Sequence, residues 1–346
     1  MIDLRSDTTT LPTEAMLETI LKAPMGDDGR IHENGRGEDS TANELEDLAA
    51  RLTGKEAACI HPSGTFGNTA SILAICHPGD KVLVDYQQHI YRTEKVVFDP
   101  RVGQLIPVLY RLNDRSTPDV EDIRRLIRGN DIRMLCVENT HNYAGGVCTT
   151  PEELAKLREV VISKNIHLHM DGARLFNAAV KLGISARELC ASVDSVMFCI
   201  SKGLGAPIGS IVCGSRDFIR KVRETRKLLG GGMRQVGVIA APGYYALQHN
   251  IDRLREDHEN AATFADEIVQ SDKISLQRET VQTNIVIIDI SKTGQKADQL
   301  TTALQDRGLK CSIIDDSHIR AVFHLGISRE DTTEAVRIFK SYLECI

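Results

Sequence analysis

A lysine directly after an apolar segment is the first feature of the sequence that could do chemistry. Lys202 follows the run 196–201 and leads into a turn that contains Gly203, Gly205 and Gly209. The apolar, partly β-branched residues predict a buried strand over 196–200. An ammonium group is costly to bury, and Lys is the amine that forms Schiff bases with carbonyl cofactors, chiefly pyridoxal phosphate (PLP). The alternative is a solvent-exposed lysine on a loop beside a strand.

An aspartate ends another apolar segment upstream of this lysine. Residues 166–170 predict a strand, and Asp171 then precedes Gly172, Ala173 and Arg174. In PLP enzymes such a carboxylate pairs with the pyridine nitrogen and keeps it protonated, so that the ring accepts electrons. The alternative is an Asx-type cap for the next helix. One helix fits between the two strands, which makes one βαβ step and brings both side chains to the same sheet edge.

Small polar residues and histidines follow three other predicted strands. Ser63-Gly64-Thr65 precedes a predicted helix, whose first N–H groups and dipole favour phosphate; the alternative is an ordinary N-cap. His89 follows the strand 80–85, and His141 follows the strand 134–137. Ligands bind beyond strand ends in open α/β sheets, so both histidines are candidate ligand contacts. The alternative for each is a buried structural histidine.

The composition limits the class of protein. The chain has 346 residues, 42% hydrophobic and 26% charged, which is ordinary for a globular protein. A net charge of −6 without a long basic run argues against a nucleic-acid partner. We expect no membrane partner and a cytoplasmic location, because neither a membrane span nor a signal peptide is present. The nine cysteines show no CxxC pair and no zinc spacing, so we expect reduced thiols and no metal site.

The elements that must position these residues divide into two parts. Alternating strands and helices predict an α/β fold with a mostly parallel sheet over 1–240, including an N-terminal arm. Residues 241–346 predict a smaller α+β domain that begins with one long helix, 244–271. The glycine-rich, acidic segment 26–40 predicts an exposed, mobile loop.

Together these motifs resemble the low-specificity L-threonine aldolases, a family of fold-type I PLP-dependent enzymes in the aspartate aminotransferase superfamily. The resemblance runs nearly end to end. It depends on seven motifs in the expected order, namely Arg5-Ser6-Asp7-Thr8, Gly26-Asp27-Asp28, Ser63-Gly64-Thr65, Glu138-Asn139-Thr140-His141, Asp171-Gly172-Ala173-Arg174, Ser201-Lys202-Gly203-Leu204-Gly205 and Gly230-Gly231-Gly232-Met233-Arg234-Gln235.

The resemblance implies a role for each candidate residue. Lys202 would bind PLP covalently, Asp171 would pair with the pyridine nitrogen, and His89 would stack on the ring. The phosphate would be held by Gly64, Thr65 and Ser201, with Arg234 reaching it from a neighbouring subunit. The substrate carboxylate would be held by Ser6, Arg174 and Arg320. His141, with His89, would lie near the β-hydroxyl of the substrate.

The implied reaction is retro-aldol cleavage of a β-hydroxy-α-amino acid. L-threonine, L-allo-threonine or a related amino acid would give glycine and an aldehyde, with a histidine as the general base. The resemblance also implies a homodimer or homotetramer with a shared active site. One alternative is a related β-eliminating lyase or amino-acid racemase that acts at the Cα–H bond. Another is a catalytically silent binding protein, against which the intact Lys202 and Asp171 argue.

Two segments depart from the family pattern. Gly29-Arg30-Ile31-His32 and a longer loop to Ser40 replace a short segment that contains an aromatic residue, and Lys95-Val96-Val97 replaces a Gly-Gly pair. We expect both departures to lie near the active-site mouth or a subunit interface. They bear on the identity of the substrate more than on the cofactor.

Overall fold

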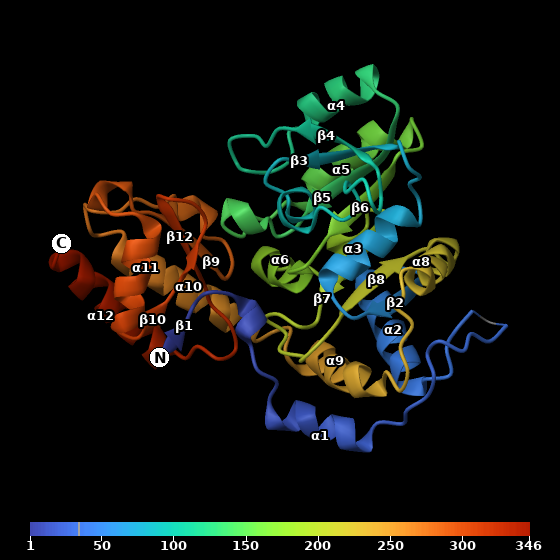
Figure 1. Ribbon diagram of the computed structural model, residues 1–346, viewed down its shortest axis with the longest axis horizontal. Coiled ribbons are helices and arrows are strands. Elements are labelled where there is room, and N and C mark those ends of the chain that lie inside the picture. The colour runs from blue at the N-terminus through green and yellow to red at the C-terminus, as the bar shows by residue number, and fades with distance from the viewer. Residues whose placement is uncertain (34) are drawn as a thin grey trace.

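A computed structural model describes residues 1–33 and 35–346. Two bodies of unequal size are visible in Figure 1, a larger one around a central sheet and a smaller one that holds the C-terminus. None of the described helices is both long enough and apolar enough to cross a bilayer. Each of the nine cysteines is a free thiol, and only Cys345 is exposed.

The larger body is built on a seven-stranded sheet of order β2-β8-β7-β6-β5-β3-β4. Only β8 runs antiparallel to its neighbours, so the predicted mostly parallel sheet is confirmed. The strands are apolar along most of their length because helices cover both faces of the sheet. Their bounds are β2 (Ala57–His61), β3 (Lys81–Asp85), β4 (Ile106–Tyr110), β5 (Ile132–Glu138), β6 (His167–Asp171), β7 (Ser195–Cys199) and β8 (Ser210–Gly214).

Alternate residues of the strands face different helices. Met170 and Val196 pack in a large core with the helices of one face, whereas Met197 and Val212 pack with α3 and α8 on the other. Asp171, next to Met170, therefore points to the α3 face. The helices of the larger body are α1 (Glu14–Lys22), α2 (Ser40–Thr53), α3 (Gly64–Leu73), α4 (Val120–Gly129), α5 (Pro151–Ile162), α6 (Leu175–Leu182), α7 (Ala186–Leu189), α8 (Arg216–Leu228) and α9 (Gly237–His249).

The smaller body has its own core around Phe264, Phe323 and Phe339. A three-stranded antiparallel sheet of order β11-β12-β9 lies at its centre. A second sheet pairs β1 of the N-terminal arm with β10 in parallel, so Ile2 belongs to this core although it begins the chain. The elements are β1 (Ile2–Asp3), α10 (Leu254–Ile268), β9 (Ile285–Asp289), α11 (Ala297–Asp306), β10 (Leu309–Lys310), β11 (Ser312–Ile313), β12 (His318–Val322) and α12 (Arg329–Glu344).

The single long helix predicted over 244–271 is wrong. Two helices, α9 and α10, are separated by a turn over 250–253. Asn250 ends α9, and its side chain donates to the carbonyl of Leu204 at 2.8 Å. Because α9 packs on α1 and α2 whereas α10 packs on α12 and α6, the chain must turn between them. The two cores divide between Leu254 and Ala261, within α10, and the domain boundary at 240–241 stays a prediction.

The segment 26–40, predicted to be exposed, is anchored by buried acidic side chains; its residue Asn34 lies outside the described part of the chain. Asp39 accepts hydrogen bonds from the N–H groups of Gly26 and Gly237 at 2.9 and 2.8 Å. Asp28 forms an ion pair with Arg226 at 2.5 Å. Exposed residues lie around Ile31 and at Glu38 and Ser40, so the prediction of an exposed loop is wrong for the two anchoring aspartates.

Candidate active site

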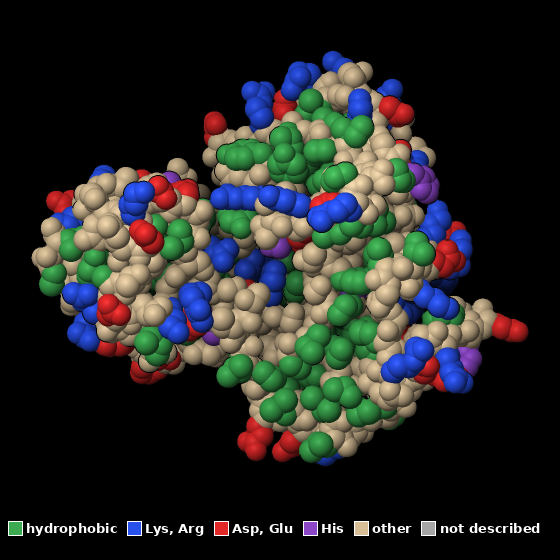
Figure 2. Space-filling view, in the orientation of Figure 1, with side chains coloured by type: hydrophobic (Ala, Val, Ile, Leu, Met, Phe, Trp, Pro, Cys, Tyr) green, Lys and Arg blue, Asp and Glu red, His purple; other side chains and the backbone are tan. Residues whose placement is uncertain are grey.

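A cavity of about 310 Å³ lies where β6 and β7 end and α3 begins. Asp171 ends β6, and Lys202 follows β7, its parallel neighbour in the sheet. Both residues line the cavity, so the prediction that they emerge at one sheet edge is confirmed. In Figure 2, Lys and Arg side chains gather in a hollow between the two bodies. A cavity at the carboxyl ends of strands is the usual ligand site of an open α/β sheet.

The carboxylate of Asp171 is almost fully buried and held by two hydrogen bonds. Its Oδ2 accepts from Nδ2 of Asn68 at 2.9 Å, and its Oδ1 accepts from the N–H of Ala173 at 3.0 Å. The second contact closes an Asx turn at Asp171 and does not cap α6, whose N-cap is Arg174 without a side-chain hydrogen bond. The alternative of an Asx-type cap for the next helix is therefore wrong.

The first turn of α3 forms one end of the cavity. Ser63 caps the helix by accepting from the N–H of Phe66 at 3.2 Å, while Gly64 and Thr65 line the cavity. A Cβ on Gly64 would lie 2.8 Å from Sγ of Cys199, so glycine allows the helix to begin this close to β7. Within the described residues no protein acceptor takes the N–H groups of Gly64 and Thr65. This end is suited to an anion.

Lys202 stands on the glycine-rich turn after β7, beside Ser201, which also lines the cavity. Gly205 has φ +82°, which closes the turn through a hydrogen bond from its N–H to the carbonyl of Lys202 at 2.8 Å. Lys202 is half-buried, and in the described part of the chain its Nζ has no hydrogen-bond partner. The amine is therefore available to a ligand.

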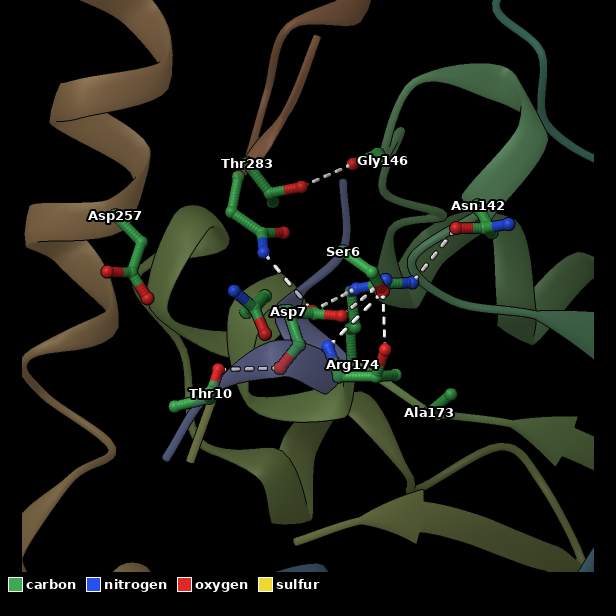
Figure 3. A network of polar contacts seen from close by, with 12 residues as sticks. Ser6, Asp7, Thr10, Asn142, Gly146, Ala173, Arg174, Asp257 and Thr283 are labelled. Atoms are coloured by element: carbon green, nitrogen blue, oxygen red, sulfur yellow. Dashed lines mark hydrogen bonds and ion pairs between the residues drawn. The ribbon is translucent and has the colours of Figure 1, made fainter. Parts of the chain in front are cut away.

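Arg174 and Arg320 line the other end of the cavity, and Figure 3 shows Arg174 beside Asp7. Arg174 donates from Nε and Nη2 to the two oxygens of Asp7, at 2.6 and 2.8 Å. Burial raises the pKa of Asp7, but the charge of Arg174 more than offsets it and lowers the pKa to about 2. Asn142 accepts from Nη1 of Arg174 at 3.1 Å and from Nη1 of Arg320 at 2.9 Å.

Arg320 lacks the carboxylate partner that Arg174 has. Its Nε is buried without a hydrogen-bond partner among the described residues. Burial, and then the nearby charge of Arg174, lower the pKa of Arg320. Ser6, on the arm beside Asp7, also lines the cavity. The structure thus brings Ser6, Arg174 and Arg320 together, and Arg320 is the cation with an unused donor.

The two candidate histidines lie in different places. His89 lines the cavity, and its Nδ1 is 2.9 Å from Oε1 of Glu94. Burial lowers the pKa of His89, but the bond to Glu94 and the charge of Asp171 raise it above its usual value.

His141 is not among the residues that line this cavity. It is buried, with its Nε2 at 3.2 Å from Asp85. Burial lowers the pKa of His141, but the charge of Glu138 raises it above its usual value. The structure therefore does not bring His141 to the cavity wall.

Arg234 also lies apart from the cavity of its own chain. Its side chain is exposed and forms an ion pair with Asp27 at 2.9 Å. The lining residues that were not among the candidates include Glu94, Glu138, Asn142 and Tyr143. Glu138 belongs to a motif already singled out, and Asn142 and Tyr143 follow it directly. The signal for these three was present in the sequence.

Three lining residues have the spacing of a possible metal site. One potential ligand atom from each of His89, Glu94 and Asp171 lies within 4.8 Å of the other two. In the structure these atoms are engaged with protein partners, since His89 bonds to Glu94 and Asp171 bonds to Asn68 and Ala173. The cluster is thus part of one continuous hydrogen-bonded wall.

A second cavity of about 430 Å³ shares Tyr143 with the first. Its lining comes from both bodies and includes Gln87, Arg92, Asp289 and His318. The guanidinium carbon of Arg92 lies 4.2 Å from the centre of the Tyr143 ring, and the hydroxyl of Tyr143 is 3.1 Å from that of Thr93. Tyr143 is therefore fixed between the two cavities.

Comparison with known proteins finds the same family throughout. Residues 3–291 match the family model described as "Beta-eliminating lyase". The chain is 37% identical to low-specificity L-threonine aldolase 1 of Arabidopsis thaliana, over 98% of this chain and 95% of that one. It is also 37% identical to the low specificity L-threonine aldolase of Escherichia coli K12, over 99% of both. A threonine aldolase structure from Leishmania major superposes with a TM-score of 0.82 at 14% identity, covering 99% of this chain and all of the other. The likeness spans both bodies, which confirms the predicted α/β fold.

Proposed function

The chain matches the beta-eliminating lyase family model and belongs, as its motifs predict, with the low-specificity L-threonine aldolases, and on this premise we propose that it is a PLP-dependent aldolase. Its substrate is L-threonine, L-allo-threonine or a related β-hydroxy-α-amino acid, which it cleaves to glycine and an aldehyde. The observation that carries the proposal is the cavity in which Asp171, Lys202 and the guanidinium of Arg320 meet. Identity of 37% to aldolases over nearly the whole chain supports it.

The residues of the cavity fit PLP at three points. The free N–H groups of Gly64 and Thr65, with Ser201, suit its phosphate, Asp171 suits its ring nitrogen, and Nζ of Lys202 suits its aldehyde. When bound, PLP supplies a ring that takes up the electron pair released at Cα of the substrate.

Arg320, Arg174 and Ser6 bind the carboxylate of the substrate in this proposal. Asp7 already occupies two donors of Arg174, so the unused Nε of Arg320 is the principal binding group. Fixing the carboxylate fixes the orientation of the bonds at Cα, and thereby decides which of them breaks. Cleavage of the Cα–Cβ bond then requires that a base remove the proton of the β-hydroxyl.

His89 is the base that we assign to this step, acting directly or through a water molecule. The carboxylate of Glu94 accepts a hydrogen bond from Nδ1 of His89, so the lone pair is left on Nε2. His141 supports His89 indirectly, because its charge acts on Glu138, whose Oε2 accepts from the backbone N–H of His89 at 2.6 Å. In this assignment Glu138 and His141 are positioning residues.

We further propose a cytoplasmic homodimer or homotetramer whose active site is shared between subunits. The exposed side chain of Arg234 supports a role across a subunit contact, since it lies apart from the cavity of its own chain. Nine free thiols support a reducing compartment.

The test is a screen for aldehyde release over a panel of β-hydroxy amino acids. The panel holds L-threonine, L-allo-threonine and bulkier members, because the second cavity at Tyr143 lies beside the proposed site. We expect glycine and an aldehyde in equal amounts from at least one member. Failure of every member to give an aldehyde would overturn the proposal. Release of ammonia and a 2-oxo acid that keeps the carbon chain of the substrate, or uptake of solvent deuterium at Cα without cleavage, would instead support the eliminating lyase or the racemase.

A further inference from the structure

A chain of hydrogen bonds runs from Asp171 along the α3 face of the sheet to the start of β6. Nδ2 of Asn68 lies 2.9 Å from Oδ2 of Asp171, and Oδ1 of Asn68 lies 3.2 Å from Nε2 of His169. Nδ1 of His169 and Nε2 of His167 each lie 2.8 Å from Oγ of Ser195. His167 lines a separate surface hollow of about 230 Å³. The chain of bonds therefore connects the candidate active site with that hollow.

The secondary structure places these residues in line. His169 and Asp171 are two positions apart on β6, so both side chains project from the same face of the sheet. Ser195 is the register partner of His169 on β7. Asn68 stands one helical turn after Gly64 on α3, so one helix holds both the proposed phosphate site and the contact to Asp171.

The donors and acceptors of this chain have only one consistent arrangement. Nδ2 of Asn68 lies between two carboxylates, at 2.9 Å from Asp171 and 3.2 Å from Glu94, so the amide must donate to both. Its Oδ1 then accepts from Nε2–H of His169, which leaves Nδ1 of His169 as an acceptor. Ser195 donates to that Nδ1 and accepts from Nε2–H of His167. Every hydrogen of the chain points toward Asp171.

Burial keeps the imidazoles of the chain neutral. Burial lowers the pKa of His169 to about 3 and that of His167 to about 4. Asn68, His169 and Ser195 are fully buried. Since buried hydrogen bonds that point in one direction polarise one another, the last donor, Asn68, is strengthened toward the negative charge of Asp171.

We propose that Asn68, His169 and Ser195 are positioning residues that hold the carboxylate of Asp171 in the orientation that suits the ring nitrogen of PLP. The inference rests on the proposed function, since it names residues that serve the same site. It gives three buried residues that do not line the cavity a role in binding the cofactor.

The test compares two serines that differ in their place in the chain of bonds. Ser195 belongs to it, whereas Ser71 on α3 is equally buried but its Oγ has no hydrogen-bond partner in the described part of the chain. Each serine, and Asn68 in a third variant, is replaced by alanine. The dissociation constant for PLP is then measured by titration of each purified protein. We expect Asn68→Ala to weaken PLP binding about 10- to 100-fold, as for outer partners of metal ligands. Ser195→Ala should weaken it about 3- to 10-fold, and Ser71→Ala should leave it within about twofold.

A second measurement reads the tautomer of His169 in the wild-type protein and needs a variant only to assign the signal. Nitrogen-15 NMR of the PLP-free wild-type protein should show His169 as the Nε2–H tautomer, with its signal assigned by its loss in His169→Gln. An Nδ1–H tautomer would overturn the inference, because the hydrogen bonds would then point away from Asp171. Equal PLP affinities in Asn68→Ala, Ser195→Ala and Ser71→Ala would overturn it as well. If the wild-type protein itself failed to bind PLP, the proposed cofactor would be wrong and the inference would fall with it.

Discussion

Two clusters of charged side chains join acidic residues near the N-terminus to later parts of the chain, and they differ in their balance of charge. One cluster consists of Asp28, Glu46, Arg223 and Arg226. It contains two carboxylates for two guanidinium groups. The other consists of Asp7, Arg174, Arg320 and the nearby Lys202, and it contains one carboxylate for three cations.

The difference in balance separates a structural role from a binding role. In the first cluster each guanidinium group also donates to the backbone of β2, Arg223 to the carbonyl of Ala58 at 3.1 Å and Arg226 to that of Ile60 at 2.8 Å. Nη1 of Arg223 and Nε of Arg226 have no hydrogen-bond partner among the described residues, but the two carboxylates balance the charge of the cluster. In the second, Arg320 keeps an unused Nε and Lys202 an unused Nζ beside a cavity. A buried excess of positive charge is costly without an anion, so the second cluster is completed by a ligand that brings negative charge.

Replacement of Lys202 should have the largest effect on activity of the changes proposed here. We expect Lys202→Ala to lower aldehyde release by about 10⁴-fold or more, because the covalent attachment of PLP is lost. The same change should leave the free energy of unfolding nearly unaltered, because Lys202 has no hydrogen-bond partner among the described residues. The measurements are steady-state kinetics, urea unfolding and reduction with borohydride.

The control for this variant is Lys221→Ala, on the exposed face of α8. Borohydride should fix a chromophore to the wild-type and Lys221→Ala proteins and not to Lys202→Ala. A chromophore fixed to Lys202→Ala would place the attachment elsewhere and remove the reason for grouping Lys202 with the binding cluster.

The next test exchanges one arginine of each cluster for methionine. Arg223→Met leaves Glu46 buried without its ion-pair partner, so we expect a loss of about 3–5 kcal/mol in the free energy of unfolding. Arg320→Met removes a cation that faces another cation, so the free energy of unfolding should change by less than about 1 kcal/mol. The KM for the amino acid should rise by about 10-fold or more in Arg320→Met, because its carboxylate loses a charged partner.

Urea unfolding and steady-state kinetics of the two variants decide this comparison. If Arg320→Met were the less stable variant and kept the wild-type KM, the assignment of the two clusters would have to be reversed. An intermediate result, in which Arg223→Met altered KM alone, would likewise contradict a purely structural role for the balanced cluster.

The sequence predicted the parts of the site that depend on local pattern. The strand that ends in Asp171 and the strand before Lys202 were recognisable from apolar runs, and one helix between them sufficed to place both at one sheet edge. The N-cap by Ser63 was also a local signal. The fold class followed from the alternation of such segments.

What the sequence did not predict depends on contacts between distant residues. The pairing of Asp7 with Arg174 joins positions 167 residues apart, and no local pattern distinguishes Asp7 from an exposed acid. Asp28 was predicted to be exposed for the same reason, since Arg226 neutralises it from a distant helix. His141 follows a strand as a ligand contact would, yet its side chain turns to Asp85 and away from the cavity wall.

The smallest expected effect concerns the response of the two clusters to acid. The pKa of Asp7 is lowered to about 2 in the folded protein, from the 3.8 of an unperturbed aspartate. A lowered pKa means that the unfolded chain takes up the proton first as the pH falls. Asp7 therefore contributes about 2 kcal/mol of stability above pH 4, which is lost between about pH 4 and pH 2. Burial, opposed by the charge of Arg223, raises the pKa of Glu46 above the 4.5 of an unperturbed glutamate. The contribution of Glu46 to stability is therefore fully present below pH 4.5 and declines as the pH rises from there through the raised pKa.

Urea unfolding at a series of pH values in Asp7→Asn and Glu46→Gln measures both contributions as changes of slope. We expect Asp7→Asn to flatten the loss of stability below pH 4, and Glu46→Gln to remove a decline above about pH 4.5. Asp99→Asn is the control, because the pKa of Asp99 is also lowered to about 2 but its partner Arg101 is exposed, so solvent screens the pair. Its slope should differ little from that of the wild-type protein. If Asp7→Asn kept the wild-type slope between pH 2 and pH 4, Asp7 would not be the carboxylate that holds Arg174 in place, and the guanidinium excess beside the cavity would be greater than the structure indicates.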